Sequence, residues 1–130
     1  GELRAATERP PRVKDLRGTL RWHAHGIITT LVSAEHRAVD RLLVECGDRL
    51  SDLRELLIDR LLRAQKQIAK DIVALAGAPE PVALSAAEIM LAALNGWDPV
   101  GLSSRGANLA ASLRYADAVV DFVIASCRAD

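Results

Sequence analysis

Histidines are the residues of this 130-residue chain best suited to metal or acid–base chemistry, and two of the three lie close together. His23 and His25 occur in a stretch whose apolar spacing predicts a helix. Residues two apart point to nearly opposite sides of a helix, whereas metal ligands on one helix are usually three or four apart. His36 is distant in sequence, and no Cys, Asp or Glu cluster completes a site. We therefore expect no metal site, while a pocket role for one of these side chains stays open.

Acidic and thiol side chains give no stronger indication of catalysis. Glu45 stands beside Cys46, but no His adjoins them and Cys46 falls on an apolar stripe, which favours a structural thiol. Glu88 lies in an otherwise apolar helix, where we expect it to be exposed near the helix start rather than to line a cavity. The sequence contains no Gly-rich phosphate loop, no paired carboxylates in an apolar setting and no nucleophile elbow. We expect no catalytic residue and no cofactor, and therefore a protein that is not an enzyme.

Asn95 and Trp97 follow an apolar helix and suggest a binding function. A Trp with an amide nearby can orient a ligand in an apolar pocket. Alternatively, Asn95 and Gly96 simply end the helix while Trp97 covers the end of the core. Both interpretations remain open from the sequence.

The overall charge excludes some partners. Lys and Arg together number 17, as do Asp and Glu, so the formal net charge is zero and no electrostatic attraction to nucleic acid or an anionic membrane is expected. No apolar run approaches the length of a membrane span. Cys46 and Cys127 lie far apart in apolar contexts, which fits buried thiols in a reducing compartment. We therefore expect a cytoplasmic protein without a membrane partner.

Apolar periodicity predicts an all-α fold of about five helices and no strand. The expected helices run over residues 13–31, 34–46, 52–76, 83–94 and 109–127, with Ser33 and Ser51 as N-caps and Gly77 as a terminator. Residues 1–12, broken by Pro10 and Pro11, are expected to be a lead-in or the remnant of a connecting helix. Residues 13–130 then form a single helical domain.

The last third of the chain, residues 83–127, has apolar residues on more than one side of each helix. The final helix carries a seam of apolar residues at steps of four and three, and further apolar or small residues, including Ala111 and Phe122, lie off this seam. One face suffices to pack a helix on its own domain, so the second face predicts a homodimer. The alternative is that the alanines are simply good helix formers.

With the helices in this order, the chain resembles the C-terminal regulatory domain of TetR-family transcriptional repressors. The stretches that carry the resemblance are "LVSAEHRAVDRLLVEC", "SDLRELLIDRLLRAQKQIAKDIVALAG", "SAAEIMLAALNGW" and "ANLAASLRYADAVVDFVIASC". They are similar to the segment between the fifth and sixth helices of that family and to its seventh, eighth and last helices. These are patterns of residue type rather than invariant motifs, and they cover residues 16–127.

The resemblance implies a domain that senses a small molecule and dimerises. In this family the last two helices of each subunit form a four-helix bundle, and the preceding helices enclose the ligand. The family binds DNA through an N-terminal helix-turn-helix, and no basic three-helix segment precedes Leu16, so we expect this chain as given not to bind DNA. We expect the dimer interface to contain Ala86, Ala87, Leu91, Leu109, Leu113, Ala116, Val120 and Val123.

An apolar inducer is expected in a cavity framed by the helices that begin at Leu16, Ser33 and Ser51. Its expected lining residues are Trp22, His25, Ile28, Leu42, Cys46, Leu61, Met90, Leu94 and Trp97. Two alternatives remain: a structural or adaptor helical dimer with a fully packed interior and no ligand, and an enzyme with polar groups converging near His23, His25 or Glu45.

Overall fold

The computed structural model describes residues 15–96 and 109–128, and this part of the chain is entirely helical. Five α-helices follow one another: α1 (Leu16–Leu31), α2 (Ala34–Cys46), α3 (Ser51–Ala76), α4 (Glu80–Asn95) and α6 (Leu109–Arg128), with a 3₁₀ turn, η1 (Gly47–Leu50), between α2 and α3. The predicted all-α class and the absence of strands are confirmed for these residues. No described helix has both the length and the apolar character needed to cross a membrane. The predicted lead-in, residues 1–12, lies outside the described residues.

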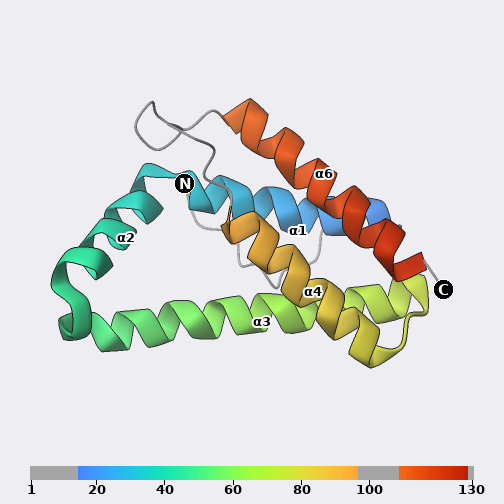
Figure 1. The fold of residues 1–130 in the computed structure, drawn as a ribbon, viewed down its shortest axis with the longest axis horizontal. Helices are drawn as coiled ribbons and strands as arrows, with labels where there is room; N and C mark the ends of the chain where they lie inside the picture. The colour runs from blue at the N-terminus through green and yellow to red at the C-terminus, as the bar shows by residue number, and fades with distance from the viewer. Residues whose placement is uncertain (1–14, 97–108, 129–130) are drawn as a thin grey trace.

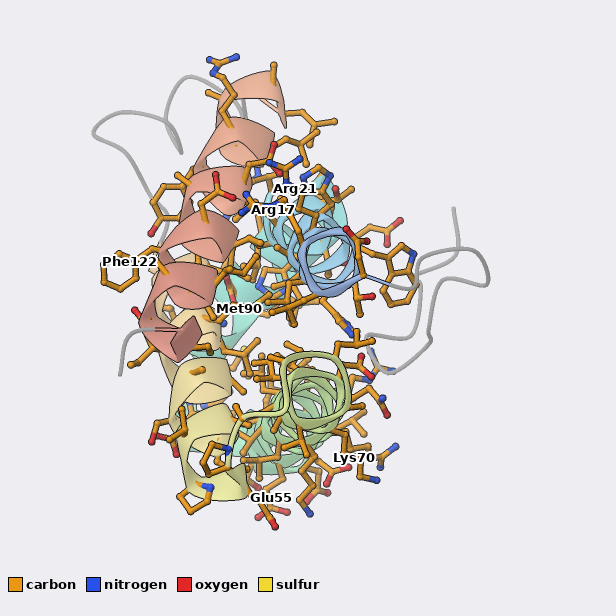
Figure 2. The ribbon with its side chains drawn as sticks, turned by 90° about the vertical axis from the view of Figure 1, so that its right-hand side faces the viewer. Arg17, Arg21, Glu55, Lys70, Met90 and Phe122 are labelled. Atoms are coloured by element: carbon orange, nitrogen blue, oxygen red, sulfur yellow. The ribbon has the colours of Figure 1, made fainter. Side chains whose placement is uncertain are left out.

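Four helices form the packed body of the protein in two layers (Figure 1). α1 packs chiefly on α6 and α3 packs chiefly on α4, while α4 and α6 lie side by side. Figure 2, viewed along the body, shows α4 and α6 on one side and α1 and α3 on the other. The centre of the core contains the fully buried residues Leu20, Ile28, Ile68, Ile72, Met90, Leu94, Val120 and Val123.

Local signals explain most helix ends. Ser33 caps α2, because the backbone N–H of His36 donates to Ser33 Oγ at 3.1 Å. Gly77 ends α3 in the left-handed conformation, with φ of 67°, and its N–H donates to the carbonyl of Val73. α4 begins at Glu80, three residues before the predicted start, because Pro81 is tolerated in a first turn.

The predicted N-cap at Ser51 is wrong. The chain passes from α2 into α3 through η1, so Ser51 is already helical, with φ of −57° and ψ of −40°, and Leu50 occupies the cap position. The Asn95–Gly96 break does end α4, but Gly96 has φ of −81° and makes no use of the freedom that glycine has. Instead, the Asn95 side chain donates to the Leu91 carbonyl at 2.8 Å.

α2 and the first half of α3 project from the body (Figure 1). α2 has sizeable contacts only with α1 and η1, its neighbours in sequence. None of its residues is buried, and the first buried residue of α3 is Ala64. We call residues 34–63 the arm.

Candidate dimer face and polar clusters

The face of the α4–α6 pair that points away from α1 and α3 keeps large apolar side chains in solvent. Val82 and Ile89 on α4 are 42% and 53% exposed, and Phe122 on α6 is 66% exposed. Figure 2 shows Phe122 directed away from the rest of the molecule. Because several exposed apolar side chains share this face, it is a candidate binding surface.

Two stripes without charge run along this face, and together we call them the outer seam. On α6 the members recur at steps of four and three, and on α4 at steps of three and four, which is the spacing by which helices of a bundle interlock. None of the members is fully buried in the protomer. The outer seam consists of Val82, Ser85, Ile89 and Ala92 on α4 and of Ala111, Tyr115, Ala118, Phe122 and Ala125 on α6.

A shallow, open groove lies between the two helices near the C-terminal end of α6. Its volume is about 350 Å³, and it is lined by Pro81, Val82, Ser85, Ala86, Ile89, Ser126 and Cys127. The lining is almost entirely apolar, and burial raises the pKa of the Cys127 thiol. Phe122 lies one turn before Ser126, so a protruding ring and an apolar hollow stand beside each other on one face.

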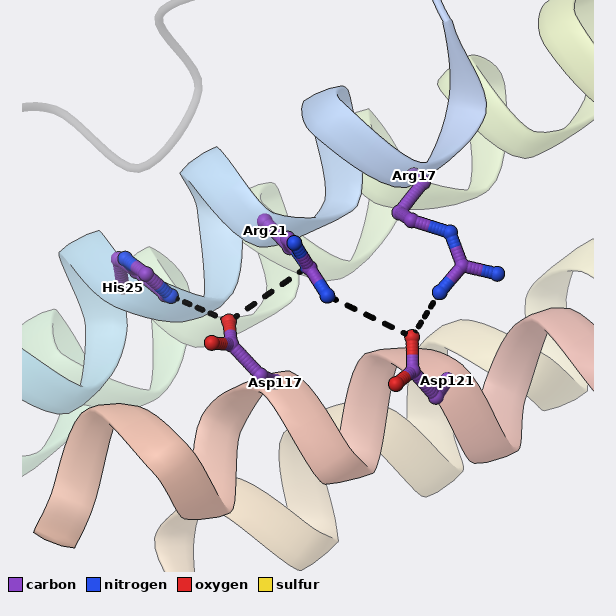
Figure 3. Close-up of polar contacts among 5 residues, drawn as sticks. All are labelled: Arg17, Arg21, His25, Asp117 and Asp121. Carbon is purple, nitrogen blue, oxygen red and sulfur yellow. Dashed lines mark hydrogen bonds and ion pairs between the residues drawn. The ribbon is translucent and has the colours of Figure 1, made fainter.

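Polar contacts join α1 to α6 along the opposite edge of α6 (Figure 3). His25 Nε2 lies 2.6 Å from Asp117 Oδ1, and Arg21 Nε lies 3.6 Å from the same oxygen. Arg17 pairs with Asp121, which Arg21 Nη2 also approaches at 3.9 Å. Residues four apart on one helix therefore meet residues four apart on the other. We call this set the α1–α6 ladder; its contacts match one register of α1 against α6.

A second polar pair is closed off from solvent inside the body. His23 Nε2 lies 2.8 Å from Asp71 Oδ2, and the two side chains are 0% and 2% exposed. The Gln67 side chain donates to the other Asp71 oxygen at 3.2 Å. Because no solvent reaches His23, a substrate cannot reach it either. This pair holds α1 against α3.

Taken together, the polar geometry of the described residues is that of structural contacts. His36 also lies beside an aspartate, with Nε2 3.3 Å from Asp40 Oδ2 one turn along α2. No group of three or more His, Cys, Asp or Glu in the described part of the chain could hold a metal ion. Both cysteines are half-buried free thiols.

The nine residues expected to line a ligand cavity are not gathered around one cavity. Ile28, Met90 and Leu94 are completely buried in the packed core. Leu42 and Leu61 lie on the arm, 48% and 40% exposed, and Cys46 is half-buried there. Trp22 and His25 are half-buried on α1, and Trp97 lies outside the described residues. The groove between α4 and α6 includes none of the nine.

Most of the residues expected at a dimer interface lie inside the protomer. Six have little or no surface left for a partner, with exposed fractions of 0–7%: Ala86, Ala87, Leu91, Ala116, Val120 and Val123. Leu109 is 46% exposed and Leu113 is half-buried. The physical reason is that each helix turns its most continuous apolar stripe inward. The outer seam is the second stripe, of which Ala111 and Phe122 were recognisable as apolar residues off the main seam.

Comparisons of the chain with protein-family models, with curated proteins and with solved structures found no match.

Proposed function

We propose that this chain is the small-molecule-sensing and dimerisation domain of a TetR-like transcriptional regulator, acting as a cytoplasmic homodimer. The proposal assigns no DNA binding to this chain itself, because the helix-turn-helix of that family is missing from this sequence. The proposal combines the sequence resemblance with the helix order, a long α3 followed by the paired helices α4 and α6. Its main support is the outer seam: an uncharged, heptad-spaced face with Phe122 in solvent.

A second copy of the chain fits this face because a two-fold interface requires one patch to provide both a projection and a recess. Phe122 is the projection, and the groove that contains Val82 and Ile89 is the recess. Two α4–α6 pairs facing each other make a four-helix arrangement in which the alanines of α6 permit close approach. The six buried side chains among those first expected at the interface lie beneath this face and fix α4 against α6.

The sensing part of the proposal is supported by the arm. Leu42 and Leu61 keep aliphatic surface in solvent on the two helices that diverge from η1, and Cys46 lies close to their junction. An apolar molecule bound between α2 and α3 would remove this surface from water. The chemistry on offer is aliphatic, so the ligand class is an apolar small molecule.

The adaptor alternative, a helical dimer without a ligand, is favoured by one observation. Met90 and Leu94, two expected lining residues, are completely buried among other core side chains. Because the body is packed in this way, a ligand would have to bind at the arm. An adaptor does not need a ligand site at all.

Light scattering coupled to gel filtration tests the dimer. Near 10 µM, a concentration on the order of that at which modest interfaces hold, the protein is expected to elute at twice its 14.0 kDa mass. Phe122→Glu should elute as a helical monomer, because it places a charge in the outer seam. The matched control is Val44→Glu, an equally drastic change at an 84% exposed arm position, which should remain dimeric. A monomeric parent protein would remove the main support for the proposal.

A thermal-shift screen with apolar compounds separates the sensor from the adaptor. A sensor should show saturable stabilisation by at least one aliphatic or aromatic compound. Leu61→Asp should abolish the shift, whereas Phe122→Glu should retain it because Phe122 lies on a different face. Absence of any binder in a protein that still dimerises would favour the adaptor.

A further inference from the structure

The arm has an unusual distribution of apolar residues: many are present, and none is buried. Leu42, Leu56, Ile58 and Leu62 are between 47% and 50% exposed. A 13-residue helix such as α2 is marginal in water unless an apolar face packs against something. In this structure α2 buries none of its residues, so its apolar face is not packed against another helix.

The first half of α3 displays a matching surface. Leu53, Leu57 and Leu61 precede the buried residues Ala64, Ile68 and Ile72 at steps of four, four, three, four and four. The stripe that forms the core thus continues along α3 beyond the point where neighbouring helices cover it. On α2, the half-buried residues Val39, Leu43 and Cys46 form a stripe of the same spacing.

The short connection between α2 and α3 favours packing of the two helices against each other. Only the four residues of η1 separate α2 from α3, so their stripes meet without the entropy loss of bringing two molecules together. Figure 1 shows the helices diverging from this junction. We propose that α2 is a lid that closes onto the first half of α3 as an antiparallel helical hairpin, and that the structure shows its open position.

Two points in the backbone are suited to the movement. Gly47 directly follows α2 as the first residue of η1, with φ of 55° and ψ of −126°, and a Cβ added there would meet nothing within 4 Å. At the other end, Val32 and Ser33 are the two residues that link α1 to α2, and the Ser33 hydroxyl donates to the Thr30 carbonyl at 2.7 Å. Closing therefore bends the chain at Gly47 and at Val32–Ser33 while the α1–α6 ladder keeps the body in place.

Distances between spin labels on the two helices test the closure. Labels at Ala34→Cys and Arg60→Cys, both exposed positions, are introduced after Cys46→Ala and Cys127→Ala remove the native thiols. Closure predicts a population with a label separation shorter than in the open structure. Leu57→Asp should lower the ratio of short to long distances by about tenfold, since it places a charge in the closing surface. Val44→Asp, on an arm residue outside the stripe, should leave the ratio unchanged.

Dilution of labelled with unlabelled protein separates closure within one chain from association of two. Closure is a property of one protomer, so the short population should survive dilution, and it is expected whether or not the protein dimerises or binds a ligand. A short population lost on dilution would assign the stripes to a second copy and overturn the proposal. So would a single long distance that Leu57→Asp does not change.

Discussion

His23 and Asp71 are the most consequential pair at the scale of single residues, since both are polar and neither reaches solvent. Each side chain provides the other with a polar contact inside the apolar core. The Gln67 side chain donates to the second oxygen of the Asp71 carboxylate. Burying both groups costs desolvation free energy, which their mutual contact offsets. Removing one partner should therefore lower the stability of the fold by more than the intact pair contributes to it.

Asp71→Ala should destabilise the fold by about 3 kcal/mol, because it removes the buried carboxylate that the His23 imidazole contacts at 2.8 Å. Urea unfolding followed by circular dichroism measures this change. The control is Asp59→Ala, which breaks the exposed pair with Arg63 and should cost at most about 0.5 kcal/mol. Equal losses in the two variants would show that the buried pair has no special role.

Cys127 should react slowly with alkylating reagents near neutral pH. Burial raises the pKa of this thiol, so the reactive thiolate forms at higher pH than in an unfolded chain. In a Cys46→Ala background, the rate of iodoacetamide modification should rise at a higher pH for folded protein than for protein in urea. Coinciding pH profiles would argue against burial of the thiol.

At the scale of helices, glycine has opposite effects at two positions. Gly26 lies in the interior of α1, where a Cβ would meet nothing within 4 Å. Its only effect there is to lower stability, because glycine loses more conformational entropy on folding than alanine does. Gly77 adopts a left-handed conformation that side chains with a Cβ disfavour.

Gly26→Ala should therefore stabilise the protein by about 0.5–1 kcal/mol, and Gly77→Ala should destabilise it by about 1 kcal/mol. Thermal unfolding of the two variants beside the parent protein measures both signs in one experiment. Changes of the same sign would contradict the assigned ends of α3 or the helical position of Gly26.

The elements were predictable from the sequence because their signals are local. Steps of three and four place Leu20, Ile68 and Val120 on helices, and Ser33 and Gly77 mark helix ends by their own chemistry. Ser51 misled because an equally good cap residue becomes part of a helix when a 3₁₀ turn leads into it. Which stripe of α4 or α6 faces inward was not predictable, since both stripes are apolar and only packing against α1 and α3 distinguishes them.

The polar contacts were also beyond the sequence. His25 meets Asp117 across 92 positions of the chain, and His23 meets Asp71 across 48, so no local spacing indicates either pair. The expected lining residues are scattered in the structure for a related reason. Periodicity identifies Met90 and Leu94 as inward-facing, but it cannot distinguish the wall of a cavity from the centre of a packed core.

At the scale of the whole molecule, stability is unevenly distributed. The body contains every buried residue described, and the arm contains none. Because burial resists local opening, the two parts should open with different free energies.

Amide hydrogen exchange should show this division directly. Amides of α2 should exchange sooner than those of α4 and of the middle of α6, even if α2 spends part of its time closed on α3. Mass spectrometry of exchanged peptides makes the measurement, with residues 64–76 of α3 as the protected reference within the same helix as part of the arm. Uniform exchange along α3 would contradict an arm that is distinct from the body.

The α1–α6 ladder also has a mechanical consequence. It ties the helix that presents Phe122 to the first helix of the described chain, through side chains spaced by one turn on both. If a second copy binds the outer seam as proposed, any displacement of α6 should reach α1 through these contacts. The 30-residue arm joins α1 only at the C-terminal end of that helix, away from Leu16.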